Sequence, residues 1–274
     1  MRDLIKTNLR WAGGKSRMTD ILETYMPSKI EKYLETFLGG GSVLLHVLQR
    51  FNPKLVYAND IDSNLVNYYS EVQQHPQQLI QELTLMKSMF NEEEFREEFT
   101  KLDRSTAVGF YAANKSSFSG LNYNYSESSY IRNFTLNSID AIGKISHIIR
   151  DVNLVNSNYL DLDRNLAIPI RGFFIYLDPP YYGNRKVGLY GRKGELHKGF
   201  DHEALHSWVE QHSADNQIMI SYDDSPYIRE LYKDYNIYDF SITYTMTNTG
   251  GNKGKTGGEI VITNYDIIGE PQLF

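Results

Sequence analysis

Asp178, Pro179, Pro180 and Tyr181 have the residue types of a rigid binding slot for a flat ring that carries an amino group. Prolines fix the backbone and lack an N–H, but their carbonyl oxygens accept hydrogen bonds, as does the Asp178 carboxylate. Tyr181 adds an aromatic face on which a planar ring can stack. A purine or a cytosine with an exocyclic amine fits such a slot. Aspartate and proline are also ordinary turn residues, so a simple strand-ending turn is an equally good interpretation of these four positions.

The segment that must position this slot is the apolar run Gly172–Leu177. An apolar run bounded by prolines predicts a strand that is buried on both faces of a parallel sheet. Because proline has no N–H for a sheet ladder, the strand is expected to end at Asp178.

A second candidate site lies near the beginning of the chain. A predicted strand, Tyr33–Phe37, is followed by the glycines Gly39–Gly41 and then by a helix with a serine at its start. This order is typical of the opening of a Rossmann-like unit. The next predicted strand, Leu55–Asn59, ends at Asp60, and an acid at this spacing suits a ribose diol. The third glycine of the dinucleotide fingerprint is missing, which favours a nucleoside-bearing cofactor without a pyrophosphate.

Gly13, Gly14, Lys15 and Ser16 precede another predicted helix and suggest a phosphate-binding loop. A Walker A loop needs a glycine at the position that Leu9 occupies, so that interpretation fails. A lysine at a glycine-rich helix entry can still receive a ligand carboxylate. Trp11 in the same segment is either a wall of the ligand pocket or part of the core.

The middle of the chain is predicted to be helical, since residues 62–117 show consecutive amphipathic patterns and no strand pattern. Residues 116–137 are predicted as a polar loop or hairpin whose serine, asparagine and tyrosine side chains could reach base edges and phosphates. By itself this stretch is equally typical of a surface loop. A further helix is expected where isoleucines recur from Ile139 to Ile149.

An α/β pattern is expected in the remainder of the chain. The expected elements are strand Val152–Val155, a helix from about His202, strand Ile218–Tyr222, helix Ile228–Tyr232 and the late strands Tyr238–Tyr244 and Glu259–Thr263, with the glycine-rich loop Asn248–Gly258 between the last two.

The totals exclude several classes of protein. The 274 residues contain no cysteine, which excludes disulfides, thiolate zinc sites and cysteine nucleophiles, and the seven histidines show no metal-ligand spacing, so no metal is expected. There is no apolar run long enough to cross a membrane and no signal-peptide core, so a soluble cytoplasmic (or host-cell intracellular) protein without a membrane partner is expected. A net charge of −6 argues against a histone-like binder but permits local contacts with DNA.

Four motifs occur in a fixed order, and their combination is specific. They are Arg10-Trp11-Ala12-Gly13-Gly14-Lys15, Phe37-Leu38-Gly39-Gly40-Gly41-Ser42, Asn59-Asp60 and Asp178-Pro179-Pro180-Tyr181. Together they resemble the DNA adenine-N6 methyltransferases whose recognition domain lies between the cofactor and catalytic motifs. The resemblance implies an α/β fold: a Rossmann-like sheet of seven mostly parallel strands with a late reversed hairpin. It also implies a catalytic domain of residues 1–61 and 151–274 and an inserted, mainly helical DNA-recognition domain at 62–150.

The resemblance also implies roles for single residues. S-adenosylmethionine would be the cofactor, with Lys15 near its carboxylate and Asp60 at its ribose. The other expected cofactor contacts are Trp11, Phe37, Gly39, Gly41, Asn158, Tyr159 and Asp178. Asp178, Pro179, Pro180 and Tyr181 would form the catalytic slot. Asn158-Tyr159 departs from an aspartate-aromatic pair that is common in relatives.

Double-stranded DNA is the expected partner, with Arg10, Ser119, Leu121, Tyr123 and Arg132 as candidate contacts. Relatives that methylate GATC carry an arginine where Tyr123 stands, so another target site is expected. The alternatives are a cytosine-N4 methyltransferase and an inactive sequence-specific DNA-binding protein. A cognate restriction endonuclease is a further possible partner, and the choice between monomer and dimer stays open.

Overall fold

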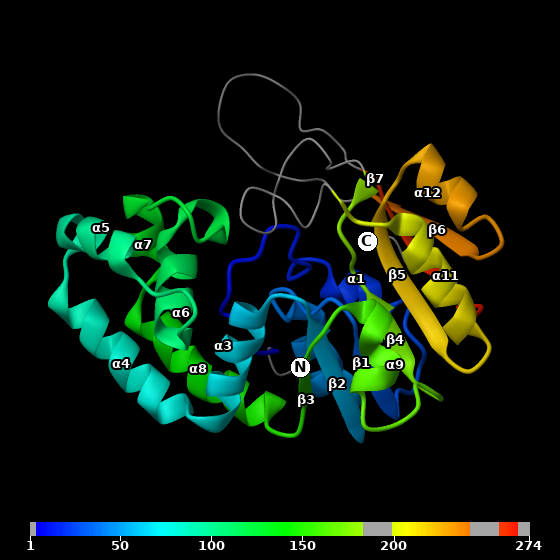
Figure 1. Cartoon of the computed structure of the whole chain (residues 1–274), viewed down its shortest axis with the longest axis horizontal. Coiled ribbons are helices and arrows are strands. Elements are labelled where there is room, and N and C mark those ends of the chain that lie inside the picture. Colours follow the sequence, from blue (N-terminus) through cyan, green and yellow to red (C-terminus); the bar gives the residue numbers. More distant parts are fainter. Residues whose placement is uncertain (1–3, 183–198, 242–257, 268–274) are drawn as a thin grey trace. The chain divides into compact units, whose positions relative to one another are not determined.

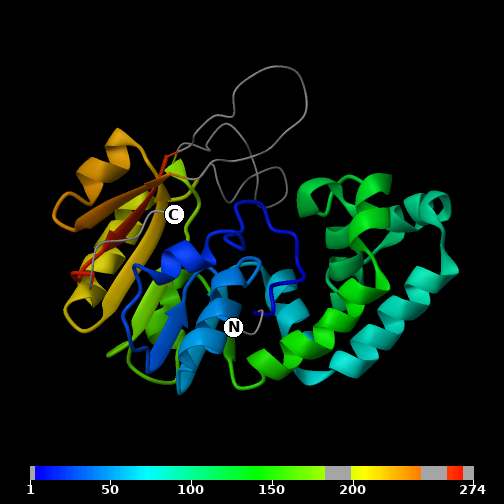
Figure 2. The ribbon, with the colours of Figure 1, turned by 180° about the vertical axis from the view of Figure 1, so that it is seen from behind.

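The computed structural model describes residues 4–182, 199–241 and 258–267. The chain divides into two compact units: Met1–Thr19 with Ile30–Ala167, and Asp20–Lys29 with Ile168–Phe274. Figures 1 and 2 show the ribbon from opposite sides. Within the described residues, no helix is long and apolar enough to span a membrane.

Seven strands form a mixed sheet with the order β3-β2-β1-β4-β5-β7-β6. The pairs β1–β2, β2–β3 and β4–β5 are parallel, whereas β7 runs antiparallel to both β5 and β6. The predicted seven-stranded, mostly parallel α/β sheet with a late reversed hairpin is therefore confirmed.

The first unit carries three of the strands and most of the helices. Its elements are β1 (Lys32–Glu35), α2 (Ser42–Phe51), β2 (Leu55–Asp60), α3 (Ser63–Gln74), α4 (Pro76–Met89), α5 (Glu92–Lys101), α6 (Ala107–Ser116), η1 (Phe118–Gly120), α7 (Glu127–Asn133), α8 (Leu136–Ile149), β3 (Asn153–Asn156), η2 (Tyr159–Asp161) and α9 (Leu162–Asn165). In both views α4 to α8 stand together, to one side of β1–β3. The boundaries 62–150 of an inserted domain stay a prediction.

The second unit carries the remaining strands. Its elements are α1 (Thr19–Glu23), β4 (Phe174–Leu177), α11 (His202–Ser213), β5 (Gln217–Asp223), α12 (Pro226–Leu231), β6 (Asn236–Ser241) and β7 (Gly258–Thr263). The predicted strands therefore exist, with their ends shifted by a few residues. Most of the predicted loop Asn248–Gly258, and the end of the strand predicted at Tyr238–Tyr244, lie outside the described residues.

The loop predicted at 116–137 is only partly correct. Ser117 and Tyr125 form an antiparallel bridge, as in a hairpin, but α7 follows it. The Ser126 side chain caps this helix by accepting from the N–H of Ser129. Tyr130 fixes the helix from its inner face, because its ring packs on Phe95 with 4.7 Å between ring centroids. The polar composition of the segment gave no signal for this buried contact.

Tyrosine is abundant mainly because it builds the core. Most of the largest fully buried side chains are tyrosines, among them Tyr68, Tyr111 and Tyr176. Tyr68 stacks on Tyr111 at 5.7 Å in the first unit, and its hydroxyl donates to Asn8 Oδ1. Buried phenols need such partners, because an unpaired hydroxyl is costly away from water. The tyrosine content is therefore chiefly a feature of packing rather than of nucleic-acid binding.

Candidate active site

Asp178 directly follows β4, whose residues are all buried. Leu177, the last residue of the strand, pairs in parallel with Ile220 of β5. Pro179 is buried, whereas Asp178 and Pro180 are half-buried. The prediction that a buried central strand ends at Asp178 is confirmed. Asp178 itself lies just beyond the last strand pairing and is partly exposed.

The two tyrosines after the prolines are held by acids on neighbouring strands. The Tyr181 hydroxyl donates to Glu259 Oε2 at 3.1 Å, and the backbone N–H of Tyr182 donates to Asp223 Oδ1 at 2.8 Å. Burial, together with the nearby Asp178 and Glu259 carboxylates, raises the pKa of Tyr181 well above its usual range. The phenol therefore keeps its proton at neutral pH and acts as a hydrogen-bond donor.

Asp60 ties the end of β2 to the glycine turn after β1. Its carboxylate accepts from the N–H of Gly39 at 2.9 Å and from the N–H of Asp62 at 3.0 Å. Asp60 is half-buried, and this burial raises the pKa of its carboxyl group to about 6 despite the two N–H donors. Two predicted cofactor residues, Gly39 and Asp60, are thus brought into direct contact.

Aromatic rings flank the same strand ends. The rings of Phe37 and Tyr159 lie 5.4 Å apart and are tilted by 46°. Tyr159 is buried, Phe37 is half-buried and Asn158 is exposed. Asn158 Oδ1 accepts from the N–H of Leu160 at 3.1 Å and so caps the short helix η2. Its side chain has a structural partner in addition to any contact with a ligand.

Trp11 packs directly on the glycine turn. A Cβ atom added to Gly39 would lie 2.8 Å from Trp11 Nε1, and one added to Gly40 would lie 2.8 Å from Trp11 Cβ. Trp11 is half-buried against this turn and so is not part of a closed core, and its role as a wall of a ligand pocket stays a prediction. Lys15 is buried, and its ammonium group donates to the carbonyl of Gly13 at 3.1 Å.

We expect Gly39→Ala to weaken S-adenosylmethionine binding about tenfold or more, because Gly39 has φ +47° and no room for a side chain against Trp11. Gly143→Ala is the matched control: its new Cβ would meet only the Ile80 Cδ1 at 3.7 Å. This helical site should tolerate alanine or gain about 1 kcal/mol of stability. Calorimetric titration of both variants with the cofactor tests this. Equal binding by the Gly39→Ala and wild-type proteins would contradict the assignment.

Asn59 is a site residue whose role the sequence did not reveal. Its side-chain amide donates to the carbonyl of Thr36 at 3.0 Å and to that of Ser157 at 3.1 Å. It therefore connects the segments that follow β1 and β3, on either side of its own strand. These segments carry Phe37 and Tyr159, so Asn59 helps to hold the backbone of both aromatic residues in place.

Arg10, a predicted DNA contact, is fixed to the hairpin that follows α6. Its backbone N–H donates to Asn114 Oδ1 at 2.9 Å, and the Asn114 amide donates back to the carbonyl of Arg10 at 2.8 Å and to that of Gly120 at 3.0 Å. The guanidinium donates to Ser117 O and Ser129 Oγ at 3.1 and 3.0 Å. Asn114 is fully buried and was not predicted as a site residue.

The other predicted DNA contacts lie on the hairpin and on α7. Ser119 and Leu121 are half-buried, and Tyr123 is 49% exposed. Arg132 is exposed on α7 and its Nε donates to the carbonyl of Ser128 at 3.0 Å. Arg10 binds Ser129, and Arg132 lies one turn further along α7; burial and then the charge of Arg132 lower the pKa of Arg10. Their combined charge favours an anionic partner.

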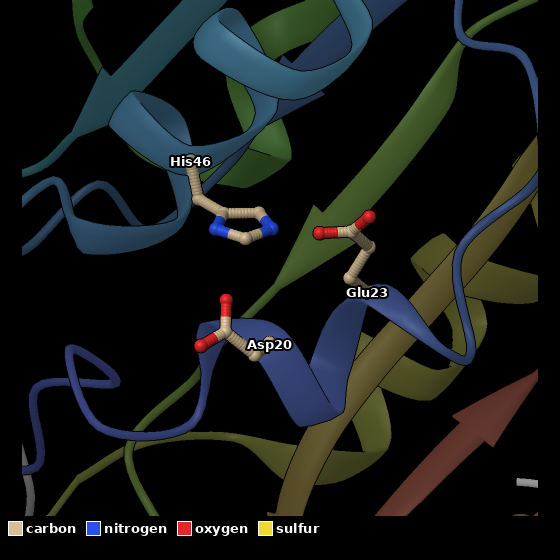
Figure 3. Close-up of side chains that lie close together, drawn as sticks. All are labelled: Asp20, Glu23 and His46. Atoms are coloured by element: carbon tan, nitrogen blue, oxygen red, sulfur yellow. The ribbon is translucent and has the colours of Figure 1, made fainter. Parts of the chain in front are cut away.

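Side chains of metal-binding type also occur outside these sites. Figure 3 shows the carboxylates of Asp20 and Glu23 on α1 and the imidazole of His46 on α2. Asp20 is exposed, whereas His46 is buried. Exposed acids on a short helix are common without an ion, and these three residues belong to different units, so we assign no metal site to them.

The sheet has the strand order and the late reversed hairpin of a Rossmann-like α/β fold. Residues 11–246 match the family described as D12 class N6 adenine-specific DNA methyltransferase, and the chain belongs to this family. It is therefore an enzyme that methylates adenine in DNA, and the family and fold imply S-adenosylmethionine as the methyl donor. The function expected from the four motifs is confirmed at this level.

Several relatives are similar over most of the chain. Type II methyltransferase M1.LlaDCHI of Lactococcus lactis subsp. cremoris is 26% identical, over 95% of this chain and 97% of its own length. Type II methyltransferase M.MjaIII of Methanocaldococcus jannaschii is 26% identical, over 95% of this chain and 99% of its own. The DNA N-6-adenine-methyltransferase of Escherichia phage P1 is 25% identical over 82% of this chain, which corresponds to 31% of the phage protein.

Proposed function

We propose that this enzyme transfers a methyl group from S-adenosylmethionine to a flipped-out adenine held at Asp178–Tyr181, within a DNA site other than GATC. The family match and the position of Asp178 at the end of a buried strand support the proposal. In duplex DNA the adenine amine is hidden, so the base must leave the stack before it can enter such a slot.

The residues of the first unit fit the cofactor. The Asp60 carboxylate is held in place by two backbone N–H groups, which leaves further acceptor capacity for the hydroxyls of a ribose. Phe37 and Tyr159 offer aromatic surfaces for an adenine ring. Gly39 lets the backbone approach a ligand closely, and Lys15 would balance a carboxylate charge. Together these groups match a nucleoside that bears an amino acid.

The chemistry at the slot follows from its acceptors. When bound, the cofactor supplies a methyl group on a positively charged sulfur. The Asp178 carboxylate and the Pro179 carbonyl accept N–H bonds from the target amine, which moves its lone pair out of the ring's conjugation and toward the methyl group. As the N–C bond forms, the bond from the methyl group to sulfur would break and S-adenosylhomocysteine would leave, and the methylated amine then loses one proton to solvent. Tyr181 stacks on the base and fixes its plane. Positioning and electrostatics therefore carry the catalysis, and no metal is required in this proposal.

Nucleoside analysis tests the proposed reaction. DNA from a methylation-deficient host that expresses the chain is expected to contain N6-methyladenine. N4-methylcytosine in its place would indicate the alternative cytosine reaction. Cofactor binding without any modified base would indicate an inactive DNA-binding protein. A cognate restriction endonuclease and a cytoplasmic location stay predictions.

The proposed target differs from GATC because Tyr123 has no forked donor. An arginine paired with guanine through two hydrogen bonds contributes roughly 1–3 kcal/mol of discrimination, and a phenol offers a single donor. Arg132 is exposed on α7, one turn beyond the Ser129 that binds Arg10, and could contact a base from another direction. We expect methylation-sensitive sequencing to reveal a non-GATC motif.

We expect Arg132→Ala to relax that motif at one or two positions. Arg150→Ala is the matched control, because Arg150 is likewise exposed in the same unit and pairs with Asp151. It should leave the motif unchanged. Uniform GATC methylation by the wild-type enzyme would contradict the proposed target. An unchanged motif in the Arg132→Ala variant would remove this arginine from recognition.

A further inference from the structure

Two carboxylates on neighbouring strands hold the two tyrosines that follow the prolines. Asp223 ends β5 and Glu259 lies near the start of β7, and the two are direct partners in the antiparallel ladder. Glu259 accepts from the Tyr181 hydroxyl at 3.1 Å, and Asp223 accepts from the Tyr182 N–H at 2.8 Å. The segment after the prolines is therefore attached to the sheet at two successive residues.

This pair of acids is costly for the sheet itself. Like charges directly opposite each other in an antiparallel pair repel, and Glu259 is only 6% exposed. A buried carboxylate needs hydrogen-bond donors to be tolerated. Tyr181 and Tyr182 each supply one such donor, so the two acids connect the ladder to the segment after the prolines.

The bond to Glu259 constrains the ring of Tyr181. A tyrosine ring turns about two side-chain bonds. Anchoring its hydroxyl restricts the first, and because a phenolic O–H prefers to lie in the plane of its ring, the direction of the Glu259 acceptor favours one ring plane about the second. On its other side the ring neighbours Tyr222, with 6.2 Å between centroids and a tilt of 38°. Because burial and nearby carboxylates raise the Tyr181 pKa, the hydroxyl remains a donor across the physiological pH range. The ring plane is thus set before any base arrives.

We propose that Glu259 is a positioning residue for methyl transfer: by accepting the Tyr181 hydroxyl, it presets the ring face against which the target base stacks. This inference rests on the proposed role of Asp178–Tyr181. Glu259 acts through Tyr181, so removing either partner of the bond is expected to have the same consequence. Equal effects of the two substitutions would distinguish a role in positioning Tyr181 from a general contribution of Glu259 to folding.

A double-mutant cycle on the full-length chain tests the inference. We expect Tyr181→Phe and Glu259→Ala each to lower kcat about tenfold, of the order of one lost hydrogen bond, with the KM for S-adenosylmethionine unchanged. The double variant should lose no more than about twofold beyond either single variant. Glu259→Gln keeps a carbonyl acceptor and should recover most of the Glu259→Ala loss.

A spectroscopic measurement reports the base directly. In a duplex with 2-aminopurine at the mapped target position, Tyr181→Phe and Glu259→Ala should shift the emission in the same way, and Glu259→Gln should restore it. The matched control is Glu203→Ala, which removes another tyrosine–glutamate bond of the same unit, from exposed Glu203 to Tyr227 at 3.4 Å. It should change neither kcat nor the emission.

Two results would overturn the inference. One is a double variant whose loss equals the product of the two single losses. The other is wild-type kcat in Tyr181→Phe, a change of one atom that is expected to fold even if Glu259→Ala does not. Failure of the proposed function would look different, because Asp178→Ala would then remain active whatever the cycle shows.

Discussion

Replacing Asp178 with alanine is expected to reduce methyl transfer by about a thousandfold or more while leaving S-adenosylmethionine binding measurable. In the proposed slot the carboxylate is the charged acceptor for the target amine, and preorganised groups of this kind typically contribute about 10²–10³ in kcat each. Asp178 carries the larger share because it combines charge with a fixed place at the end of β4. Single-turnover methylation of DNA and calorimetry with the cofactor measure the two quantities separately.

The control for this variant is Asp215→Ala, which removes a partly exposed acid of the same unit that pairs with Arg171. It should methylate DNA at the wild-type rate, since surface ion pairs contribute little. If Asp178→Ala stayed within about tenfold of wild type, or about 1.4 kcal/mol of barrier, Asp178 would have no central role. Asp178→Asn keeps one acceptor oxygen and should retain more activity than Asp178→Ala.

The second large effect is expected at Asp60. Asp60→Ala should weaken S-adenosylmethionine binding about a hundredfold, because it removes the ribose acceptor and also releases the Gly39 N–H from its anchor. DNA binding should change far less, since the recognition contacts lie elsewhere. Calorimetry with each ligand tests this difference. Equal losses for both ligands, or none for the cofactor, would mean that Asp60 does not serve the cofactor site.

Asp60 also predicts how cofactor binding depends on pH. Burial raises its pKa to about 6, from an ordinary value of 3.8. If the ionised form binds the ribose, affinity falls as the pH drops through about 6, and it falls about tenfold per unit below that. The folding stability of the cofactor-free chain depends on pH in the opposite direction. A raised folded-state pKa makes ionisation unfavourable to folding above pH 6, and acidification relieves that cost. Loss of binding near pH 5 would therefore not reflect unfolding at Asp60, and Asp60→Asn should show no such pH dependence.

The elements that the sequence predicted best are those with a local signal. The run Gly172–Leu177 is apolar and ends in prolines, so β4 and the position of Asp178 follow from it directly. The glycine turn and the acid at the end of β2 are likewise visible as spaced residue types. In these places local propensity and tertiary packing agree, so reasoning from the sequence succeeds.

The residues that were missed act across long distances in the chain. Asn114 binds Arg10 across 104 positions, and Asn59 binds Ser157 across 98. Glu259 reaches Tyr181 across 78 positions. A single polar residue has no periodicity, and its partner is decided only when the sheet or the helices assemble. For the same reason α7 was taken for a loop, since Tyr130 and, at its end, Phe134 pack on Phe95 of another helix.

The hydrogen bonds of Asn114 to the backbone have a consequence for how new DNA target sequences can evolve. Its amide bonds only to backbone groups, those of Arg10 and Gly120, and so makes no demand on the side chains at the neighbouring positions. Leu121 and Tyr123 can therefore be exchanged while the hairpin keeps its place, whereas Ser119, with φ +53°, accepts fewer residue types. A lineage could pass from one target sequence to another by single substitutions, without an unstable intermediate. The backbone held by Asn114 would be kept, while the side chains proposed to contact the DNA could change.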